Sequence, residues 1–493
     1  MPLLLGDVIA CAAAASPRAV AVTLGDESLT FADVEARAHR MTNALTGLGL
    51  ARGDRLAWWS EIDLRGVDLY VGAGRAGVAF APLNPAFRPD EAMPVVEYLR
   101  PRLLVVDAAH AEAAASFGVP LAVTGWRGGA CPGADLDALT AAASAGEPSV
   151  APPAEEDIAA IFLTSGSTGR PKGVMISHRA TWLRTSAGAA AHQTSRGKGE
   201  VVMFPLFHMA GWNFSAMAWS AHKAAHQVRR AEGEELLDAV SRHRAGTIYC
   251  IPAVWHRILE VKGDADVSSV EWALTGTSQV GTELLAAIKD RFPGARSTVN
   301  YGSTETARAV ALADDDLFRK PGRVGIPIPG VRARIDDGEL LLATDRVMSG
   351  YFELPDETAE VLQDGWYRTG DLAEIDDEGY LSIVGRRKEV IRTGGETVAP
   401  AEVEALLVTH PRVREAAVIG LPDAQWGELV CAVVVVRDGA EPPSVADLRD
   451  HIGDRLAPFK HPRRVVAVDR LPRTSATGQI QRARLRLTVG APT

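Results

Sequence analysis

Lysine is scarce in this chain, and no segment is rich in basic residues. Only eight of the 52 lysine and arginine residues are lysine, and the formal net charge of the 493 residues is −10. A protein that holds nucleic acid by its phosphates needs a basic surface, so we expect no nucleic-acid partner. The preference for arginine, together with abundant alanine, is typical of a GC-rich genome and indicates no chemistry by itself.

Cysteines and long apolar runs are also few. The four cysteines are far apart, without a CxxC pair or a histidine at zinc-ligand spacing, which argues against a disulfide framework and a zinc site. No run of about eighteen apolar residues occurs, so we expect no transmembrane span and no membrane partner. The start of the chain lacks a basic region, and Asp7 interrupts its apolar run, which predicts a helix and not a signal peptide. The expected location is a reducing cytoplasm.

Apolar, strand-like runs alternate with amphipathic, helix-like stretches early in the chain. Such alternation predicts parallel α/β layers. A stretch rich in Gly, Pro, Ala and Ser, residues 128–155, predicts a long surface connection. The predicted strands are 20–24, 55–59, 78–82 and 103–106, and the predicted helix is 31–48.

The second half of the chain predicts smaller units. Two turns rich in acid and glycine, 336–338 and 376–379, lie between alternating segments and predict antiparallel hairpins. After Pro400 the pattern predicts an α+β domain of about 100 residues. The predicted fold is therefore α/β, with a large N-terminal domain of layered α/β subdomains plus a small β unit (1–386) and a small α+β C-terminal domain (387–493). Within the latter we expect a helix from 401, strands near 416–420 and 430–436, a helix near 445–456 and a strand near 464–468.

The segment from Leu163 to Gly173 reads LTSGSTGRPKG and lies between two apolar, strand-like runs. Small and hydroxyl-bearing residues let main-chain N–H groups and side chains surround phosphate oxygens. It is not a Walker loop, because Pro171 precedes Lys172 and a strand-like run follows where a Walker loop would open a helix. A plain Gly/Ser linker is the alternative. The predicted phosphate-binding residues are Thr164, Ser165, Gly166, Ser167, Thr168 and Lys172.

This loop resembles the phosphate-binding motif of the adenylate-forming superfamily, which includes acyl-CoA synthetases, aryl-CoA ligases, firefly luciferase and nonribosomal adenylation domains. The resemblance spans nearly the whole chain, and it implies an enzyme that handles acyl-adenylates and makes thioesters. Its ligands would be AMP, acyl-AMP and CoA. The further motifs follow in order: FPLFH from Phe204, NYGSTE from Asn300, GIPIPG from Gly325, YRTGD from Tyr367 and GRRK from Gly385.

The resemblance also assigns roles in a nucleotide site. Tyr301 would stack on adenine, and Gly302 would permit the ring to approach closely. Glu305 would hold Mg²⁺ with Thr168, since Mg²⁺ takes few protein ligands beside nucleotide phosphates. Asp371 and Arg386 would hold the ribose, Thr304 would bond a phosphate oxygen, and Asn300 and Ser303 complete the predicted nucleotide-binding residues.

In the family, the C-terminal domain is mobile and alternates between an adenylating and a thioester-forming orientation. The resemblance implies that Lys388 is the hinge, which agrees with its place between the two predicted domains. Two adjacent glycines have no side chains to block a narrow channel, although an ordinary Gly-Gly turn is the alternative. The implied CoA tunnel residues are Arg392, Gly394, Gly395 and Glu396.

The acyl end of the site is implied by the segment around His208, which in the family lies beside the carboxylate. Trp212 and Asn213 would line the acyl pocket, with Gly276 and Thr277 on another wall. A core histidine and a core tryptophan are the alternatives. The apolar neighbours indicate a bulky hydrophobic acid, for example a polycyclic natural product.

One residue departs from the family pattern. The family ends with a P-x-T-x-x-G-K segment whose lysine reaches the carboxylate and the α-phosphate during adenylation, but here Gln479 follows Gly478. Losing one preorganised donor costs roughly 10²–10³ in rate, so adenylation should be severely impaired. The residues implied for thioester formation, 386–396, are intact.

The sequence thus leads to the hypothesis that the enzyme carries out only the thioesterification half-reaction. Acyl-AMP would come from a separate adenylating enzyme, and ATP and Mg²⁺ would be used only if adenylation is retained. Four alternatives stay open: a complete ATP-dependent synthetase whose lysine was changed to Gln479 by engineering, a compensating residue, a non-catalytic acyl-adenylate binder, and a carrier protein as acceptor instead of CoA.

Overall fold

The structure of the protein is a computed structural model. It describes residues 2–164, 171–192, 194–195, 197–394, 396–423, 425–474 and 478–489. Lys388 lies inside the second of two compact units, so the predicted boundary at 386/387 and the hinge stay predictions. The first unit comprises Met1–Pro321, Pro327–Arg332 and Ala343–Tyr367, and the second comprises Gly322–Ile326, Ala333–Leu342 and Arg368–Thr493.

One sheet of the first unit contains most of the early strands that the sequence predicted. Its strand order is β19-β9-β8-β4-β3-β5-β6-β7. The strands from β8 to β7 pair in parallel, whereas β9 pairs antiparallel with β8 and β19. The strands are β3 (Arg55–Trp59), β4 (Ala79–Pro82), β5 (Leu103–Asp107), β6 (Leu121–Thr124), β7 (Ala134–Asp135), β8 (Ile158–Thr164), β9 (Lys172–Ser177) and β19 (Gly350–Tyr351).

A second sheet of the first unit has the order β16-β15-β14-β13-β12-β10-β11-β1-β2. Its β1 comes from the start of the chain and pairs in parallel with β11. The first two strands of the chain therefore form one edge of this sheet and do not belong to the first sheet. The strands are β1 (Val20–Leu24), β2 (Glu27–Thr30), β10 (Glu200–Val202), β11 (Ala225–Gln227), β12 (Thr247–Tyr249), β13 (Trp272–Gly276), β14 (Arg296–Ser303), β15 (Ala307–Leu312) and β16 (Ile326–Pro327).

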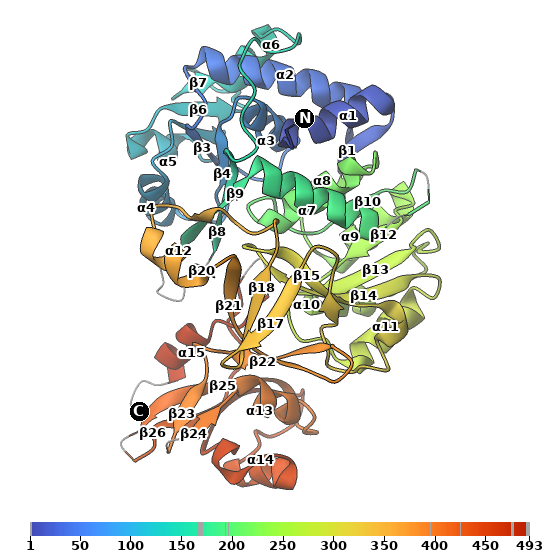
Figure 1. The fold of residues 1–493 in the computed structure, drawn as a ribbon, viewed down its shortest axis with the longest axis vertical. Helices are drawn as coiled ribbons and strands as arrows, with labels where there is room; N and C mark the ends of the chain where they lie inside the picture. The colour runs from blue at the N-terminus through green and yellow to red at the C-terminus, as the bar shows by residue number, and fades with distance from the viewer. Residues whose placement is uncertain are drawn as a thin grey trace. The chain divides into compact units, whose positions relative to one another are not determined.

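Helices α7 and α8 pack against each other and against the sheets of the first unit (Figure 1). Helix α7 (His178–Ala191) contacts β8 and β9 of one sheet and β15 of the other, and α8 (Met209–Ser220) packs on β10 and β11. Helix α7 begins after Ser177, whose hydroxyl accepts a hydrogen bond from the Ala180 N–H and so caps the helix. The other helices of the unit are α1 (Leu5–Ala15), α2 (Phe31–Gly47), α3 (Arg65–Arg75), α4 (Pro89–Leu99), α5 (Ala111–Ala114), α6 (Leu136–Ala142), α9 (Gly233–His243), α10 (Pro252–Glu260), α11 (Thr282–Arg291) and α12 (Pro355–Val361).

The surface connection predicted for residues 128–155 is only partly correct. Within it, β7 pairs with β6, and α6 begins at Asp135, whose carboxylate accepts a hydrogen bond from the Ala138 N–H at 3.0 Å. These elements are too short for a hydrophobic period to reveal them, and only Leu136 of α6 is buried.

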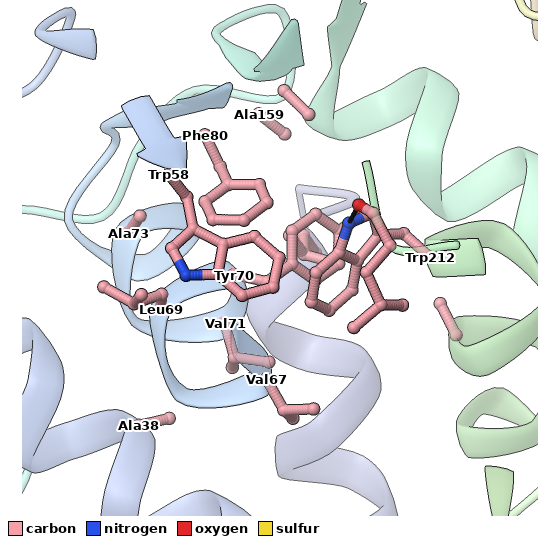
Figure 2. Packing of buried hydrophobic residues seen from close by; sticks show 14 of the residues in the cluster. Ala38, Trp58, Val67, Leu69, Tyr70, Val71, Ala73, Phe80, Ala159 and Trp212 are labelled. Atoms are coloured by element: carbon pink, nitrogen blue, oxygen red, sulfur yellow. Dashed lines mark hydrogen bonds between the residues drawn. The ribbon is translucent and has the colours of Figure 1, made fainter. Parts of the chain in front are cut away.

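Trp212 on α8 lies in the core between the sheets, where it is 1% exposed. Its ring stacks on Tyr70 at 4.3 Å between centroids and meets Phe80 edge-on at 5.4 Å, as Figure 2 shows. Its indole N–H donates to the Leu206 carbonyl at 2.5 Å. This is the core position that the sequence left as the alternative, and the predicted role of Trp212 at the acyl pocket stays a prediction.

Trp212→Ala is expected to lower the free energy of unfolding by about 3–5 kcal/mol, because it removes a large buried ring and leaves a cavity. Denaturant titration measures this loss. Phe318→Ala is the control, since that ring is 52% exposed and should change stability by about 0.5 kcal/mol or less. Native stability with lost acyl transfer would instead place Trp212 at the acyl pocket.

Glu200 on β10 is a buried carboxyl group beside a small cavity of about 20 Å³, which Lys223 and Thr194 also line. Its Oε1 has no hydrogen-bond partner among the described residues. Burial raises the pKa of Glu200 to about 8, although the nearby Lys223 charge opposes the rise. The folded protein therefore keeps this proton at neutral pH, whereas the unfolded chain ionises near pH 4.3.

This difference makes Glu200 a source of pH-dependent instability. Because the folded pKa is raised, stability is greatest below the unfolded pKa and falls as the pH rises toward the folded pKa. Glu200→Gln removes this titrating group. The free energy of unfolding of the variant minus that of the native chain should therefore rise by roughly 1.4 kcal/mol per pH unit between pH 5 and 8. Denaturant titrations across this range test it, with exposed Glu234→Gln as control. A constant difference would contradict the assignment.

The second unit contains both predicted hairpins. A turn at Asp337 and Gly338 joins β17 to β18, and Asp376 closes the turn between β21 and β22 by accepting a hydrogen bond from the Tyr380 N–H at 2.9 Å. β21 pairs antiparallel with β22. β20 pairs with Trp366 and Tyr367, the first residues of β21, and this pair belongs to the first unit. These strands are β17 (Arg332–Asp336), β18 (Glu339–Ala343), β20 (Leu362–Gln363), β21 (Trp366–Ile375) and β22 (Leu381–Arg386).

The last hundred or so residues form the predicted α+β domain. Its sheet has the order β24-β23-β26-β25, with β27 pairing in parallel with β26. The predicted fold class, a large N-terminal and a small C-terminal α/β domain, is confirmed. The elements are β23 (Ile391–Thr393), β24 (Glu396–Val398), α13 (Pro400–Leu407), β25 (Val413–Asp423), β26 (Gly427–Val436), α14 (Val445–Ile452), β27 (Arg464–Ala467) and α15 (Arg482–Val489). In the part of the chain that the structure describes, no helix is long and apolar enough to cross a membrane.

Candidate active site

The predicted phosphate loop connects two antiparallel strands. Thr164 ends β8, Lys172 begins β9, and the two residues pair directly. A strand follows the loop, as expected, and not the helix of a Walker loop. The loop itself, 165–170, lies outside the described residues. It includes the predicted residues Ser165, Gly166, Ser167 and Thr168.

The NYGSTE segment forms a tight turn between β14 and β15. Gly302 opposes Arg308 across the two strands, and a Cβ atom on Gly302 would lie 1.9 Å from the Ala307 carbonyl oxygen. Only glycine fits there. The hairpin itself therefore requires glycine at 302, and it places Thr304 and Glu305 at its tip. The close approach of Gly302 to the adenine ring stays a prediction.

Arg184, on α7, holds this turn from behind. Its guanidinium donates to the main-chain carbonyls of Arg346 (2.8 Å), Thr304 (3.0 Å) and Glu305 (2.7 Å). Burial lowers the pKa of Arg184 to about 9, and the Glu305 charge opposes this, so the side chain is cationic at neutral pH. Three donors in one plane therefore fix the segment that carries Glu305.

Tyr351 links the carboxylate of Glu305 to the phosphate loop. Its hydroxyl donates to Glu305 Oε1 at 3.1 Å, and the Lys172 ammonium lies 4.8 Å from the centre of its ring. Burial raises the pKa of Tyr351, so the phenol stays protonated as a donor. The structure thus brings Lys172 and Glu305, more than a hundred residues apart in sequence, to one place.

This arrangement fits Mg²⁺ held with a nucleotide. Glu305 offers one oriented carboxylate, and no group of three or more His, Cys, Asp or Glu within the described residues could hold a metal ion by itself. Mg²⁺ prefers one or two carboxylates with phosphate oxygens and water. Glu305 would therefore hold the ion, which would neutralise phosphate charge during adenylation.

The two predicted ribose residues meet in the second unit. Asp371 pairs with Arg386 across β21 and β22, and Arg386 Nε lies 2.9 Å from Asp371 Oδ1. Asp371 is 7% exposed, and a carboxylate in this position can accept hydrogen bonds from two adjacent hydroxyls.

The predicted CoA loop is the hairpin of β23 and β24. Gly394 has a φ of +60°, and a Cβ atom there would lie 2.9 Å from the indole of Trp426. Its N–H donates to the Trp426 carbonyl at 2.8 Å. Arg392 and Glu396 lie on the two strands, and Gly395 lies outside the described residues. The turn therefore needs glycine at 394, as in the alternative of an ordinary Gly-Gly turn. The predicted role of Gly394 in a CoA tunnel stays a prediction.

Gln479 lies beside an antiparallel bridge between Arg473 and Ile480, and residues 475–477 between them lie outside the described residues. The Thr474 N–H donates to the Gln479 carbonyl at 2.8 Å, and the Gln479 N–H donates to Thr474 Oγ1 at 3.1 Å. Arg473 Nη1 also donates to the Gly478 carbonyl at 2.7 Å. The nearest lysine in sequence, Lys460, is engaged with the Glu402 carboxylate. An uncharged amide therefore occupies the position of the family's lysine.

His208 immediately precedes α8 and is half-buried. Burial lowers its pKa to about 4, so the imidazole is neutral at physiological pH. A neutral imidazole can donate one hydrogen bond and accept another. In this state His208 can orient a carboxylate or a thioester oxygen without a fixed charge. Asn213, one helical turn along α8, donates to the Met217 sulfur at 3.5 Å.

The other predicted acyl wall is strained. Gly276, with a φ of +153°, pairs with Asn300, and a Cβ atom on it would lie 2.5 Å from the Tyr249 hydroxyl. Thr277 has a φ of +67°, which is rare for a β-branched residue. Backbone strain of this kind is frequent at ligand sites.

The sequence did not reveal Arg184 or Tyr351. Both act through contacts with residues far along the chain, and neither lies in a motif quoted above. The predicted residues that the structure brings together are Lys172 with Glu305 and Gly276 with Asn300 in the first unit, and Asp371 with Arg386 in the second.

Comparison with known proteins agrees with this geometry. The family model "AMP-binding enzyme" matches residues 10–352, and "AMP-binding enzyme C-terminal domain" matches 402–477. The chain is 32% identical over 491 residues to a feruloyl-CoA synthase of an Amycolatopsis species, covering 96% of this chain and 97% of the relative.

A second relative and a solved structure extend the comparison. A 3-[(3aS,4S,7aS)-7a-methyl-1,5-dioxo-octahydro-1H-inden-4-yl]propanoyl:CoA ligase of Rhodococcus jostii is 30% identical over 493 residues, covering 94% of this chain and 95% of the relative. ATP-bound MatB from Rhodopseudomonas palustris superimposes with a TM-score of 0.90 at 29% identity, covering 100% of this chain and 99% of that one. The chain belongs to the AMP-binding enzymes of the adenylate-forming superfamily and is an acyl-CoA ligase.

Proposed function

We propose that this acyl-CoA ligase carries out the thioesterification half-reaction and has lost most of its adenylation activity. The CoA thiolate attacks the carbonyl carbon of acyl-AMP, forming the C–S bond. The C–O bond to the phosphate breaks, AMP leaves with the electron pair, and the thiol proton goes to solvent. The products are acyl-CoA and AMP.

Gln479 is the observation that supports this proposal. In adenylation, a lysine at this position would orient the carboxylate and offset the charge that develops on the α-phosphate. The amide of Gln479 can donate a hydrogen bond but carries no charge. Loss of one preorganised donor costs roughly 10²–10³ in rate. Because two hydrogen bonds with Thr474 hold the main chain of Gln479, the proposed loss concerns the side chain.

The residues for the second step are retained. Arg392, Gly394 and Glu396 form a defined hairpin, and the neutral His208 can meet the acyl carbonyl. The nucleotide residues remain useful, because acyl-AMP still has an adenine, a ribose and one phosphate. A separate adenylating enzyme would supply this acyl-AMP, and ATP and Mg²⁺ would be needed only for residual adenylation.

We further propose a bulky hydrophobic acyl group, such as a polycyclic natural-product acid. The relatives named for feruloyl and methyl-dioxo-octahydroindenyl propanoyl substrates support an acid of this size. The competing proposal is a complete ATP-dependent synthetase in which another residue compensates for Gln479. A carrier protein instead of CoA is a further alternative for the acceptor.

Parallel incubations separate these proposals. One contains the protein with synthetic acyl-AMP and CoA, and the other contains free acid, ATP, Mg²⁺ and CoA, over a panel of acids, with acyl-CoA measured by mass spectrometry. Product from acyl-AMP alone is expected. Comparable product from acid and ATP would establish the complete synthetase instead.

A further inference from the structure

A half-buried arginine, Arg308, without an anionic partner among the described residues lies on the sheet face that carries the predicted acyl wall. Residues that oppose each other on paired strands point to the same face, and so do alternate residues of one strand. The pairs Gly276 with Asn300 and Gly302 with Arg308 therefore place Asn300 and Arg308 on one face. Tyr249 shares this face, because its hydroxyl reaches over Gly276.

Helix α7 meets this face at Arg308. The Arg308 Nη1 lies 3.1 Å from Nε2 of His192, which ends α7. Burial, with the Arg308 charge as the second cause, lowers the pKa of His192 to about 3. His192 is therefore neutral and accepts the hydrogen bond without compensating the charge. One nitrogen of the guanidinium is thus positioned by the protein itself.

The opposite edge of the same guanidinium is unused. Nε of Arg308 is buried and has no partner, and no described residue accepts a hydrogen bond from Nη2 or forms an ion pair with Arg308. Burial lowers the pKa of Arg308 to about 10, which leaves it charged. Buried, uncompensated charges cost several kcal/mol, and the Nε–Nη2 edge is the fork that binds a carboxylate in bidentate fashion.

A second donor on this face also lacks a partner. The Nδ2 of Asn300 is buried without an acceptor among the described residues. Buried polar groups in native proteins are nearly always paired. A ligand that supplies hydrogen-bond acceptors at this predicted wall would explain why these donors have no acceptor in the described part of the protein.

We propose that Arg308 determines acyl specificity by binding a second, free carboxylate on the acyl group, with Asn300 as an accessory donor. The substrate is then an acyl-AMP whose bulky body ends in a carboxylate remote from the reacting carbonyl. This inference rests on the proposed function, since it names the substrate class of the same acyl site.

Matched substrates test it. Acyl-AMPs that share one alicyclic or aryl body and differ only at the remote position, as carboxylate, primary amide, methyl ester or hydrogen, are compared by kcat/KM with CoA saturating. The native enzyme is expected to prefer the carboxylate over the ester by about 10²-fold or more, because an unpaired buried donor penalises the analogue that lacks the acceptor. Arg308→Met should remove the preference, and Arg308→Lys should keep part of it. The exposed Arg230→Met is the control.

Affinities of the corresponding stable acyl-sulfamoyl adenosines, measured by calorimetry, provide a second readout that needs no turnover. If no acyl-AMP is converted but the carboxylate analogue binds most tightly, the proposed function fails and the specificity stands. Equal affinities for carboxylate and ester in the native enzyme, or an unchanged preference in Arg308→Met and Arg308→Lys, would overturn the specificity.

Discussion

Gln479→Lys is expected to raise acyl-CoA formation from free acid, ATP, Mg²⁺ and CoA by roughly 10²–10³-fold, the usual contribution of one preorganised donor to an anionic transition state. The main chain at residue 479 is held by two hydrogen bonds, from the Thr474 N–H to the Gln479 carbonyl and from the Gln479 N–H to the Thr474 hydroxyl. The substitution changes none of these bonds. A lysine placed there would add a cation in the position that the family uses.

The matched control is Gln363→Lys, which makes the same change of charge on an exposed residue of β20. It should leave ATP-dependent synthesis at the native level. Rates with preformed acyl-AMP should change far less in Gln479→Lys than rates with ATP. If Gln479→Lys gains nothing, adenylation is limited by another part of the site, and the role assigned to Gln479 is incorrect.

Arg184→Met is expected to lower acyl-CoA formation from acyl-AMP and CoA by about 10²-fold. Arg184 holds the turn that carries Thr304, the residue predicted to bond a phosphate oxygen, and a shift of about 1 Å in a positioned group can cost that much. The substitution leaves the carbonyls of Thr304, Glu305 and Arg346 without their donor. Each unsatisfied buried acceptor costs about 1–3 kcal/mol, but the buried charge is also removed. We therefore expect a net loss of roughly 2–4 kcal/mol in the free energy of unfolding.

Arg184→Lys distinguishes positioning from charge. Lysine keeps the cation but lacks the planar fork that reaches three carbonyls, so the rate should stay low although part of the stability returns. Rates are measured well below the unfolding temperature, together with denaturant titrations. Arg179→Met, on the same helix, removes only an exposed pair with Glu155, which is worth about 0–1 kcal/mol. Native activity in Arg184→Lys would show that the Glu305 turn does not depend on this fork.

Local patterns in the sequence were sufficient for β3, β4 and β5 of the first sheet, the two hairpins and the C-terminal domain. Each of these elements depends on alternation or turn residues within about ten positions. The sequence could not predict that β1 joins the second sheet, because that pairing connects Val22 with Ala225. The short β7 and α6 were missed because their stabilising contacts are also nonlocal.

The same distinction applies to the site. Ordered motifs led to the predictions for Lys172, Glu305, Asp371 and Arg386, since each belongs to a short recognisable segment. Arg184, Tyr351 and Arg308 act through contacts between distant segments, as in the bond from Arg184 on α7 to the Glu305 carbonyl. A single buried arginine in a helix has no periodic or compositional signal, so only the folded chain reveals what it holds.

The main-chain position of Gln479 also has a genetic consequence. Glutamine and lysine codons differ by one base, CAG against AAG, and the two hydrogen bonds between Thr474 and Gln479 hold the main chain at this position. Under the proposed function, a complete synthetase and a half-reaction enzyme on this scaffold are separated by one point mutation in either direction. A population that lost its adenylating partner could recover the full activity in a single step under selection for growth on the free acid.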